Sequence, residues 1–219
     1  MDNLQLIERA VQDNSWVAFV FIGSFLLIVV LKSVFEKQFN DFLGLIYTDK
    51  YIKLYSEGNL SWFSIVLIFT QLISYSLFVQ IVLNNLGYLD KNSFISFTQI
   101  FIFLSFFVSL KYLLEKSIAV LFGIQDFYNR FLFQQATYKM YFGLGLLLLN
   151  FIMFYGKTPI DSITYLIIGL FAVLNLIIYL ISYRIFQKEI IGNLFYFILY
   201  LCTLEIAPYY FTYYWLTKY

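Results

Sequence analysis

The stretch GNLSWFSIVLIFTQLISYSLFVQIVLNNLGYL, residues 58–89, carries no charged side chain. A helix needs about 20 mostly apolar residues to cross the hydrocarbon core of a bilayer, and this stretch is long enough. Five other long intervals between charges follow the same pattern. The sequence therefore predicts an all-α integral membrane fold of about six transmembrane helices, near residues 15–32, 61–84, 94–112, 139–155, 162–183 and 193–216.

The composition agrees with one polytopic membrane domain over residues 1–219. Apolar residues make up 62% of the chain and charged residues only 12%, far from the usual globular mixture. The net charge of +1 provides no field that would attract nucleic acid. Histidine is absent and Cys202 is the only cysteine, so His-based catalysis and multi-cysteine metal sites are not available. We expect no enzymatic activity, no cofactor, no metal and no nucleic-acid partner.

The distribution of Lys and Arg predicts the orientation. Ten of them follow the first, third and fifth predicted helices: Lys32, Lys37, Lys50, Lys53, Lys111, Lys116, Arg130, Lys139, Arg184 and Lys188. The other side has four: Arg9, Lys91, Lys157 and Lys218. Cytoplasmic loops carry the excess of basic residues. Both termini are therefore predicted on the periplasmic side of a bacterial inner membrane.

Residues 33–58 connect the first two predicted spans and carry a two-sided pattern. Aromatic and aliphatic side chains recur at helical spacing from Phe35 to Tyr55, and charged side chains occupy the other positions. The pattern predicts one amphipathic interfacial helix that rests on the bilayer by burying its aromatic side. A docking surface for a partner protein is the alternative interpretation.

Three shorter features lie nearer the middle of the chain. Lys111 and Glu115 are four residues apart and can pair on one helix face, which we expect to be solvated. The apolar pattern of the third span continues as far as Gly123, so this helix is predicted to extend beyond the bilayer and stop there. The GLG run at residues 143–145 predicts a close contact between helices.

The run FYFILYLCTLEIAPYY, residues 195–210, contains the one charged side chain of the last span, Glu205. A charge at mid-membrane costs about 2.5–3.5 kcal/mol or more, so it marks either function or an internal partner. Pro208 lacks a backbone donor and is expected to kink this helix beside the acid. Helical spacing places Cys202 and Tyr209 on the same stripe as Glu205.

Gln71, Asn150 and Asn175 lie at a similar depth within their own spans and are the predicted polar partners of Glu205. No basic residue is available at that depth, so Glu205 is predicted to be either protonated or hydrogen-bonded to amides, hydroxyls or water. The leading interpretation is a hydrogen bond that fastens helices together. A proton or substrate relay and a contact with a partner subunit are the alternatives.

The run FYFILYLCTLEIAP, the six-span layout and the segment DKYIKLYSEGN together resemble an uncharacterised family of inner-membrane proteins from Bacteroidetes-type bacteria. The sharpest part of the resemblance is LCTLEIAP, from Leu201 to Pro208. The resemblance implies a Gram-negative inner membrane and no assigned activity, cofactor or substrate. Export and gliding machinery are distinctive of this lineage, which implies a small membrane subunit of such an assembly.

Two functions from different classes follow. The first is a non-catalytic inner-membrane subunit or assembly factor, in contact with the lipid bilayer and other integral membrane proteins, with envelope protein export or gliding as its context. The alternative is a small transporter or flippase that uses Glu205 as a proton or polar-substrate site. An enzyme that acts on lipids is a third hypothesis. The sequence offers few catalytic groups for it, because the single acid, Glu205, has neither a histidine nor an activated nucleophile beside it.

Overall fold

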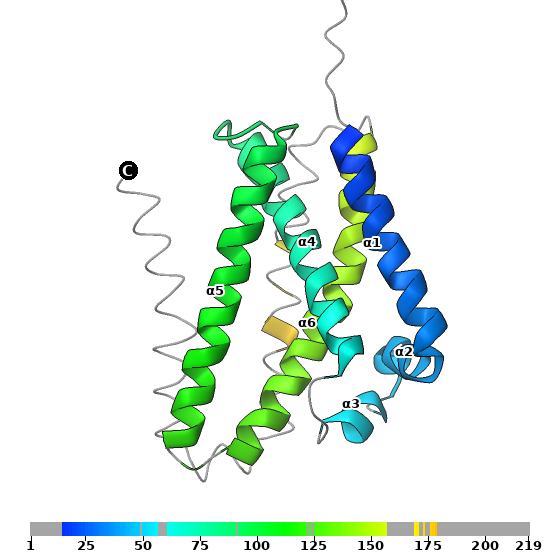
Figure 1. The fold of residues 1–219 in the computed structure, drawn as a ribbon, viewed down its shortest axis with the longest axis vertical. Coiled ribbons are helices and arrows are strands. Elements are labelled where there is room, and N and C mark those ends of the chain that lie inside the picture. The colour runs from blue at the N-terminus through cyan, green and yellow to red at the C-terminus, as the bar shows by residue number, and fades with distance from the viewer. Residues whose placement is uncertain are drawn as a thin grey trace, which may run out of the picture.

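The computed structural model describes residues 15–48, 50–56, 61–90, 92–121, 123 and 125–156, together with 169–170, 173 and 176–178. Its regular elements are all helices (Figure 1). They are α1 (Ser15–Val34), α2 (Glu36–Leu43), η1 (Gly44–Ile46), α3 (Lys50–Tyr55), α4 (Trp62–Asn85), α5 (Phe94–Leu121) and α6 (Gln125–Tyr155).

Four of these helices are long and apolar enough to cross a membrane, namely Ser15–Val34, Trp62–Asn85, Phe94–Leu121 and Tyr128–Tyr155. They correspond to the first four predicted spans, so the described part of the chain has the helical composition of a membrane protein. The predicted spans 162–183 and 193–216 lie outside the described residues, apart from the helical residues 169–170, 173 and 176–178.

Helices α5 and α6 form a hairpin at one end of the bundle (Figure 1). The predicted continuation of the third helix as far as Gly123 is confirmed, because α5 continues to Leu121 and the chain turns at Gly123, whose φ is +67°. The predicted start of the fourth helix at residue 139 is wrong, because α6 begins at Gln125. Polar residues between 125 and 139 ended the apolar pattern without ending the helix. Buried Tyr128, Phe131 and Met140 carry its packing face through this region.

Helix α4 is central and packs against α1, α5 and α6. Helices α4 and α6 run in the same direction and approach closely at Gly143 (Figure 1). A Cβ atom added at Gly143 would lie 2.8 Å from Cγ of Gln71 and 3.0 Å from its Cα. The predicted helix contact at the GLG run is therefore confirmed for Gly143. It does not extend to Gly145, where an added Cβ atom would meet nothing within 4 Å.

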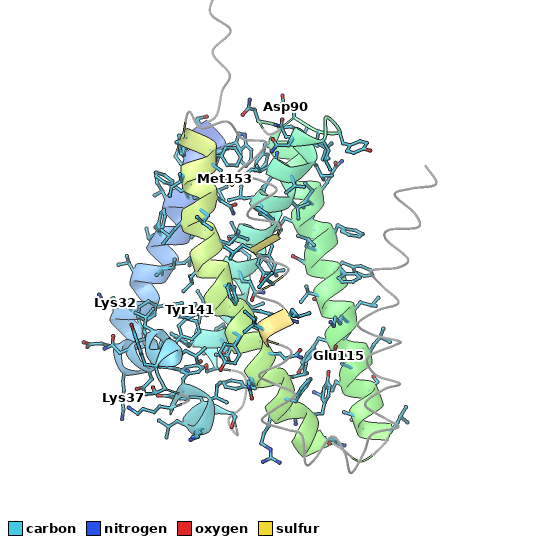
Figure 2. The ribbon with its side chains drawn as sticks, turned by 180° about the vertical axis from the view of Figure 1, so that it is seen from behind. Lys32, Lys37, Asp90, Glu115, Tyr141 and Met153 are labelled. Carbon is cyan, nitrogen blue, oxygen red and sulfur yellow. The ribbon has the colours of Figure 1, made fainter. Side chains whose placement is uncertain are left out.

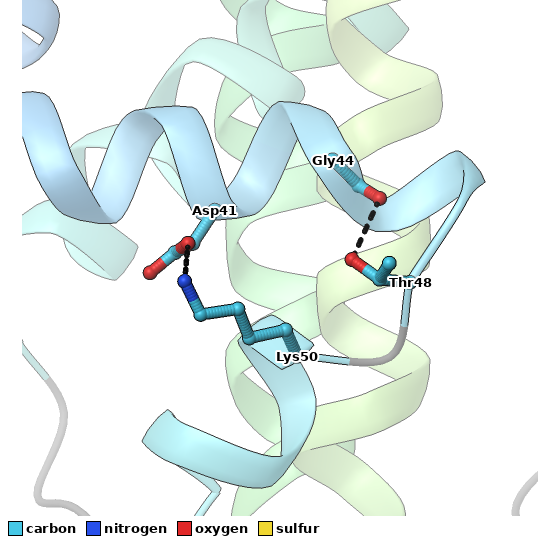
Figure 3. Close-up of polar contacts among 4 residues, drawn as sticks. All are labelled: Asp41, Gly44, Thr48 and Lys50. Atoms are coloured by element: carbon cyan, nitrogen blue, oxygen red, sulfur yellow. Dashed lines mark hydrogen bonds and ion pairs between the residues drawn. The ribbon is translucent and has the colours of Figure 1, made fainter.

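The predicted single interfacial helix over residues 33–58 is wrong in detail. The chain forms α2, η1 and α3 in succession, which we call the platform, with breaks at Phe35 and after η1. Polar contacts hold the second break (Figure 3): the Thr48 hydroxyl donates to the Gly44 carbonyl at 3.3 Å, and Lys50 pairs with Asp41 at 2.7 Å. A straight helix could not place both α2 and α3 over the same core.

The aromatic side of the platform faces protein. Phe39, Phe42 and Tyr51 are buried and cluster with Phe63 of α4. The Tyr51 ring also stacks on Phe133 of α6, with ring centroids 5.9 Å apart. The expectation that this aromatic side rests on the bilayer is therefore wrong, because α4 and α6 cover it.

The described Lys and Arg residues lie toward the end of the bundle that carries the platform and the α5–α6 hairpin, which we call the basic end. Figure 2 places Lys32, Lys37 and Glu115 toward this end and Asp90 at the opposite one. At a rise of about 1.5 Å per residue, Lys32, Lys111 and Lys139 each lie about 25 Å along their helices from the opposite end. These three lysines therefore mark one level across α1, α5 and α6.

Candidate functional site

Two of the predicted intramembrane polar residues, Gln71 and Asn150, fall within the described part of the chain. The other five lie outside the described residues: Glu205, Pro208, Cys202, Tyr209 and Asn175. Gln71 is half-buried on α4 against Gly143 of α6. Asn150 lies two helical turns after Gly143 and contacts Ser74, which lies about one turn after Gln71 on α4. Both residues belong to the α4–α6 interface.

The Asn150 side chain is completely buried and joins the two helices. Its Nδ2 donates to the backbone carbonyl of Ser74 at 2.8 Å and lies 3.5 Å from the Ser74 hydroxyl oxygen. Its Oδ1 atom is buried and has no hydrogen-bond partner among the described residues. The contact fastens α4 to α6 and leaves the Oδ1 acceptor of Asn150 without a partner among the described residues.

Most buried hydroxyls in the long helices are satisfied locally. Ser24, Thr70, Ser76 and Thr137 each donate to the carbonyl oxygen four residues earlier in the same helix. Such back-bonding hides a hydroxyl within its own helix. The donor of each of these hydroxyls is therefore used within its own helix.

A second polar site lies between α5 and α6 near the basic end (Figure 2). The Tyr128 hydroxyl donates to Oε2 of Glu115 at 2.6 Å, and Lys111 Nζ lies 3.7 Å from Oε1. The predicted Lys111–Glu115 pair is confirmed, but the expectation of a solvated face is wrong, because Glu115 is only 3% exposed. Its carboxyl group needs these partners, since an unpaired buried charge is very costly.

Sequence reasoning missed Tyr128 as part of this site. The signal was Gly123, which ends α5 and turns the chain so that α6 runs back beside it. Residues at similar distances on either side of that turn face each other, as Glu115 and Tyr128 do. From the sequence, a helix was predicted on the Glu115 side of Gly123, but the next helix was predicted to start at residue 139, so Tyr128 was not placed on a helix facing Glu115.

Two glutamines extend this polar region along α6. Gln134 and Gln135 are almost completely buried, and the Nε2 atom of each has no hydrogen-bond partner among the described residues. On α5, the Oγ atom of Ser105 is buried and unpaired in the same sense. Two amide donors and one hydroxyl are thus buried without a hydrogen-bond partner in the described part of the chain.

The opposite end of the bundle is closed by a tightly bonded turn. Gln80, fully buried on α4, donates through Nε2 to the carbonyls of Asp90 and Ser93 at 3.3 and 2.9 Å. Trp16 Nε1 donates to the carbonyl of Asn92 at 2.8 Å, which ties α1 to the same turn. These bonds hold α1, α4 and α5 together at that end.

Two groups on the platform have shifted pKa values. The hydrogen bond and attraction to Asp41 raise the pKa of Lys50. Burial in the aromatic cluster raises the pKa of the Tyr51 hydroxyl, although Gln38 and Ser64 oppose the shift. The Lys50 shift reports the ion pair between α3 and α2, and the Tyr51 shift reports burial of α3 in the aromatic cluster.

Comparison with known proteins places the chain in a family. The family described as "Domain of unknown function (DUF4271)" matches residues 17–216, which is most of the sequence. The chain belongs to the DUF4271 family. No curated protein and no solved structure matches it.

The DUF4271 region contains the platform, both polar sites and all four long helices. Within the described residues, no group of three or more His, Cys, Asp and Glu side chains could hold a metal ion. The two polar sites can donate and accept hydrogen bonds, and the Glu115 site also contains an ionisable carboxyl group beside a phenol and an amine.

Proposed function

We propose that this DUF4271 protein is a non-catalytic subunit or assembly factor of a larger complex in a bacterial inner membrane. In this proposal the chain has six spans, with both termini periplasmic and the platform cytoplasmic. Its surroundings are lipid and other integral membrane proteins, and envelope protein export or gliding in Bacteroidetes is the cellular context.

The proposal rests on the large apolar side chains that are exposed on the outward side of the platform. Its inner side is filled by its own aromatic cluster, yet Leu43, Tyr47 and Leu54 remain exposed on the other side, with Tyr47 at 87%. Trp62, at the adjacent start of α4, is 75% exposed. Large exposed apolar side chains beside charged ones are typical of surfaces that bind another protein. A rigidly packed base makes that surface preformed, which lowers the cost of ordering it on binding.

Copurification from mild detergent tests the proposal. A tagged chain extracted from its native membrane should retain a partner in stoichiometric amount. The double variant Tyr47→Ala/Leu54→Ala should lose that partner, whereas Ile102→Ala, which alters an exposed side chain in the middle of α5, should keep it. A wild-type chain that purifies alone would remove the support for a complex.

A small transporter or flippase is the second candidate. The buried, unpaired Oδ1 of Asn150 favours it, because a polar acceptor at that depth suits a protonated acid or a polar substrate group. Glu205 is the proposed acid, with Pro208, Cys202 and Tyr209 around it. Glu205→Gln keeps the hydrogen-bonding shape but cannot ionise. If a deletion strain carrying Glu205→Gln behaves as wild type, proton coupling at Glu205 is contradicted.

A further inference from the structure

Three unpaired polar atoms lie between the basic end and the middle of the α5–α6 hairpin: Oγ of Ser105, Nε2 of Gln134 and Nε2 of Gln135. All three are buried and without partners among the described residues, and a fourth such atom, Oδ1 of Asn150, lies nearer the opposite end of α6. A buried polar group without a hydrogen bond costs several kcal/mol in an apolar layer, where nothing else can satisfy it. Native proteins satisfy such groups with ordered water.

The hairpin register places these atoms at neighbouring levels. The bond between Tyr128 and Glu115 fixes the two helices opposite each other near the turn. From that bond, Gln134 and Gln135 lie about 10 Å along α6, and Ser105 lies about 15 Å along α5. Ser105 follows Phe101 by one helical turn, and Phe101 packs against Phe69 of α4, so this side of α5 faces the bundle.

Polar side chains lie between this region and the basic end. Tyr128 and Lys111 both contact the Glu115 carboxyl group, at 2.6 and 3.7 Å. In the other direction along α6 the side chains are apolar. Phe142 follows Gln135 at the spacing of two helical turns, and Leu146, which belongs to the apolar core, comes one turn later and before Asn150.

We propose that water enters the bundle from the basic end, past Glu115, and binds at Ser105, Gln134 and Gln135, forming a hydrated polar site that stops at Phe142 and Leu146. The ligand is water, which supplies an acceptor to the two amides and both an acceptor and a donor to the hydroxyl. Ser105 lies about 9 Å further along α5 from the basic end than Lys111 does. Water bound at Ser105 would therefore lie deeper in the apolar layer than the level shared by Lys32, Lys111 and Lys139.

Cysteine labelling in sealed membrane vesicles tests this inference. In a chain whose single native cysteine is replaced by Cys202→Ser, we would introduce Ser105→Cys, which changes one atom, and the adjacent Phe106→Cys. Both positions have the same depth, but Phe106 is 66% exposed on the outer side of α5. A small cationic methanethiosulfonate should modify Ser105→Cys at least tenfold faster than Phe106→Cys, because the thiolate forms only where water reaches it.

Further single-cysteine variants define the direction and extent of the site. Tyr47→Cys reports which vesicle face is the basic end, and Ser105→Cys should react only with reagent on that face. Gln135→Cys should react as fast as Ser105→Cys or faster, and the equally buried Leu146→Cys should not react. Gel filtration confirms that each variant is folded.

Three results would overturn the inference: Ser105→Cys reacting no faster than Phe106→Cys, equal access from both faces, or rapid labelling of Leu146→Cys. Labelling does not depend on a bound partner. Its outcome is therefore independent of the copurification test of the proposed function.

Discussion

At the scale of single residues, Gly143 determines how closely α4 and α6 pack. Gly143→Ala would place a methyl group 2.8 Å from Cγ and 3.0 Å from Cα of Gln71, and the backbone atom cannot rotate away. Overpacking of this kind costs about 1–3 kcal/mol. We expect a lower melting temperature for the purified variant in detergent. Gly145→Ala is the matched control, since it meets nothing within 4 Å, and equal melting temperatures for the two variants would contradict the packing argument.

Tyr128 is the second residue whose removal has a predictable cost. Tyr128→Phe removes the 2.6 Å hydrogen bond to the Glu115 carboxyl group and leaves the ring in place. A bond to a charged, buried acceptor is worth about 1.5–3 kcal/mol, so thermal unfolding should begin at a lower temperature. Tyr112→Phe on the exposed side of α5 serves as the control. Similar unfolding curves for the two variants would show that the Tyr128 bond contributes little.

The residue scale also shows what sequence could predict of the sites. Asn150 was predicted from its depth in a span as a polar partner of Glu205, which stays a prediction; within the described residues its side chain joins α6 to Ser74 of α4. Gly143 was identified from a small-residue pattern. Tyr128 was not identified, because its contact with Glu115 depends on how the turn at Gly123 orients α6 against α5. The spacing of side chains within one helix does not say which residues of a neighbouring helix they contact. Glu205 was identified as well, but its surroundings lie outside the described residues.

At the scale of elements, the platform shows why periodicity predicts a helix better than its breaks. Phe39 and Phe42 share one helical stripe, whereas Tyr51 lies nine residues after Phe42 and would point to the opposite side of one straight helix. All three are nevertheless buried in the same cluster, because the segment is broken into α2, η1 and α3. The break after η1 depends on contacts between residues on either side of it, as in the Asp41–Lys50 pair, which no single-helix pattern records. The start of α6 was also predicted too late. The polar residues between 125 and 139 were interpreted as lying before the helix, although they end only the apolar pattern and not the helix.

Alkaline pH should loosen the platform. The pKa values of Lys50 and Tyr51 are both raised in the folded protein. When the pKa of a group is higher in the folded protein than in the unfolded chain, the protonated group favours the folded state. Its contribution to the free energy of unfolding is complete at pH values below the unfolded-state pKa, and it is lost as the pH rises through the folded-state pKa. The loss therefore begins above about pH 10. Melting temperatures measured between neutral pH and pH values above that point should fall.

Tyr51→Phe separates this effect from the titration of other tyrosines. The variant keeps the stacked ring and has no hydroxyl to ionise, so its alkaline loss of stability should be smaller than that of the wild type. An identical pH profile for the two proteins would mean that Tyr51 is not responsible. Lys50→Met should likewise flatten the profile, through loss of the pair with Asp41.

At the scale of the whole molecule, the two ends of the bundle should lie on opposite sides of a membrane. Tyr47 at the basic end and Tyr88 in the turn at the opposite end are both highly exposed. With Cys202→Ser as background, Tyr88→Cys should react with an impermeant maleimide on intact cells, and Tyr47→Cys should react only in inverted vesicles. The reverse pattern would invert the proposed orientation. Labelling of both residues from one side would contradict a membrane-crossing bundle.

The level shared by Lys32, Lys111 and Lys139 has a consequence for the lipid around the protein. Between that level and the opposite end of the bundle, α1, α5 and α6 each offer about 25 Å of uncharged length, which is less than the roughly 30 Å of a typical hydrocarbon core. The difference is a hydrophobic mismatch, relieved by local thinning of the bilayer or by lysine stems reaching toward the headgroups, at a fraction of a kcal/mol per Å. Helix α4 carries no charge from Trp62 to Asn85, so the mismatch concerns the other three helices.

The protein should therefore be most stable in bilayers of short-chain lipids, with a melting temperature that falls as acyl chains lengthen. Lys139→Leu lengthens the uncharged part of α6 and should shift the optimum toward thicker bilayers, whereas a melting temperature that is independent of chain length would contradict the mismatch. In a membrane of uneven thickness, the protein would then be found mainly in the thinner regions.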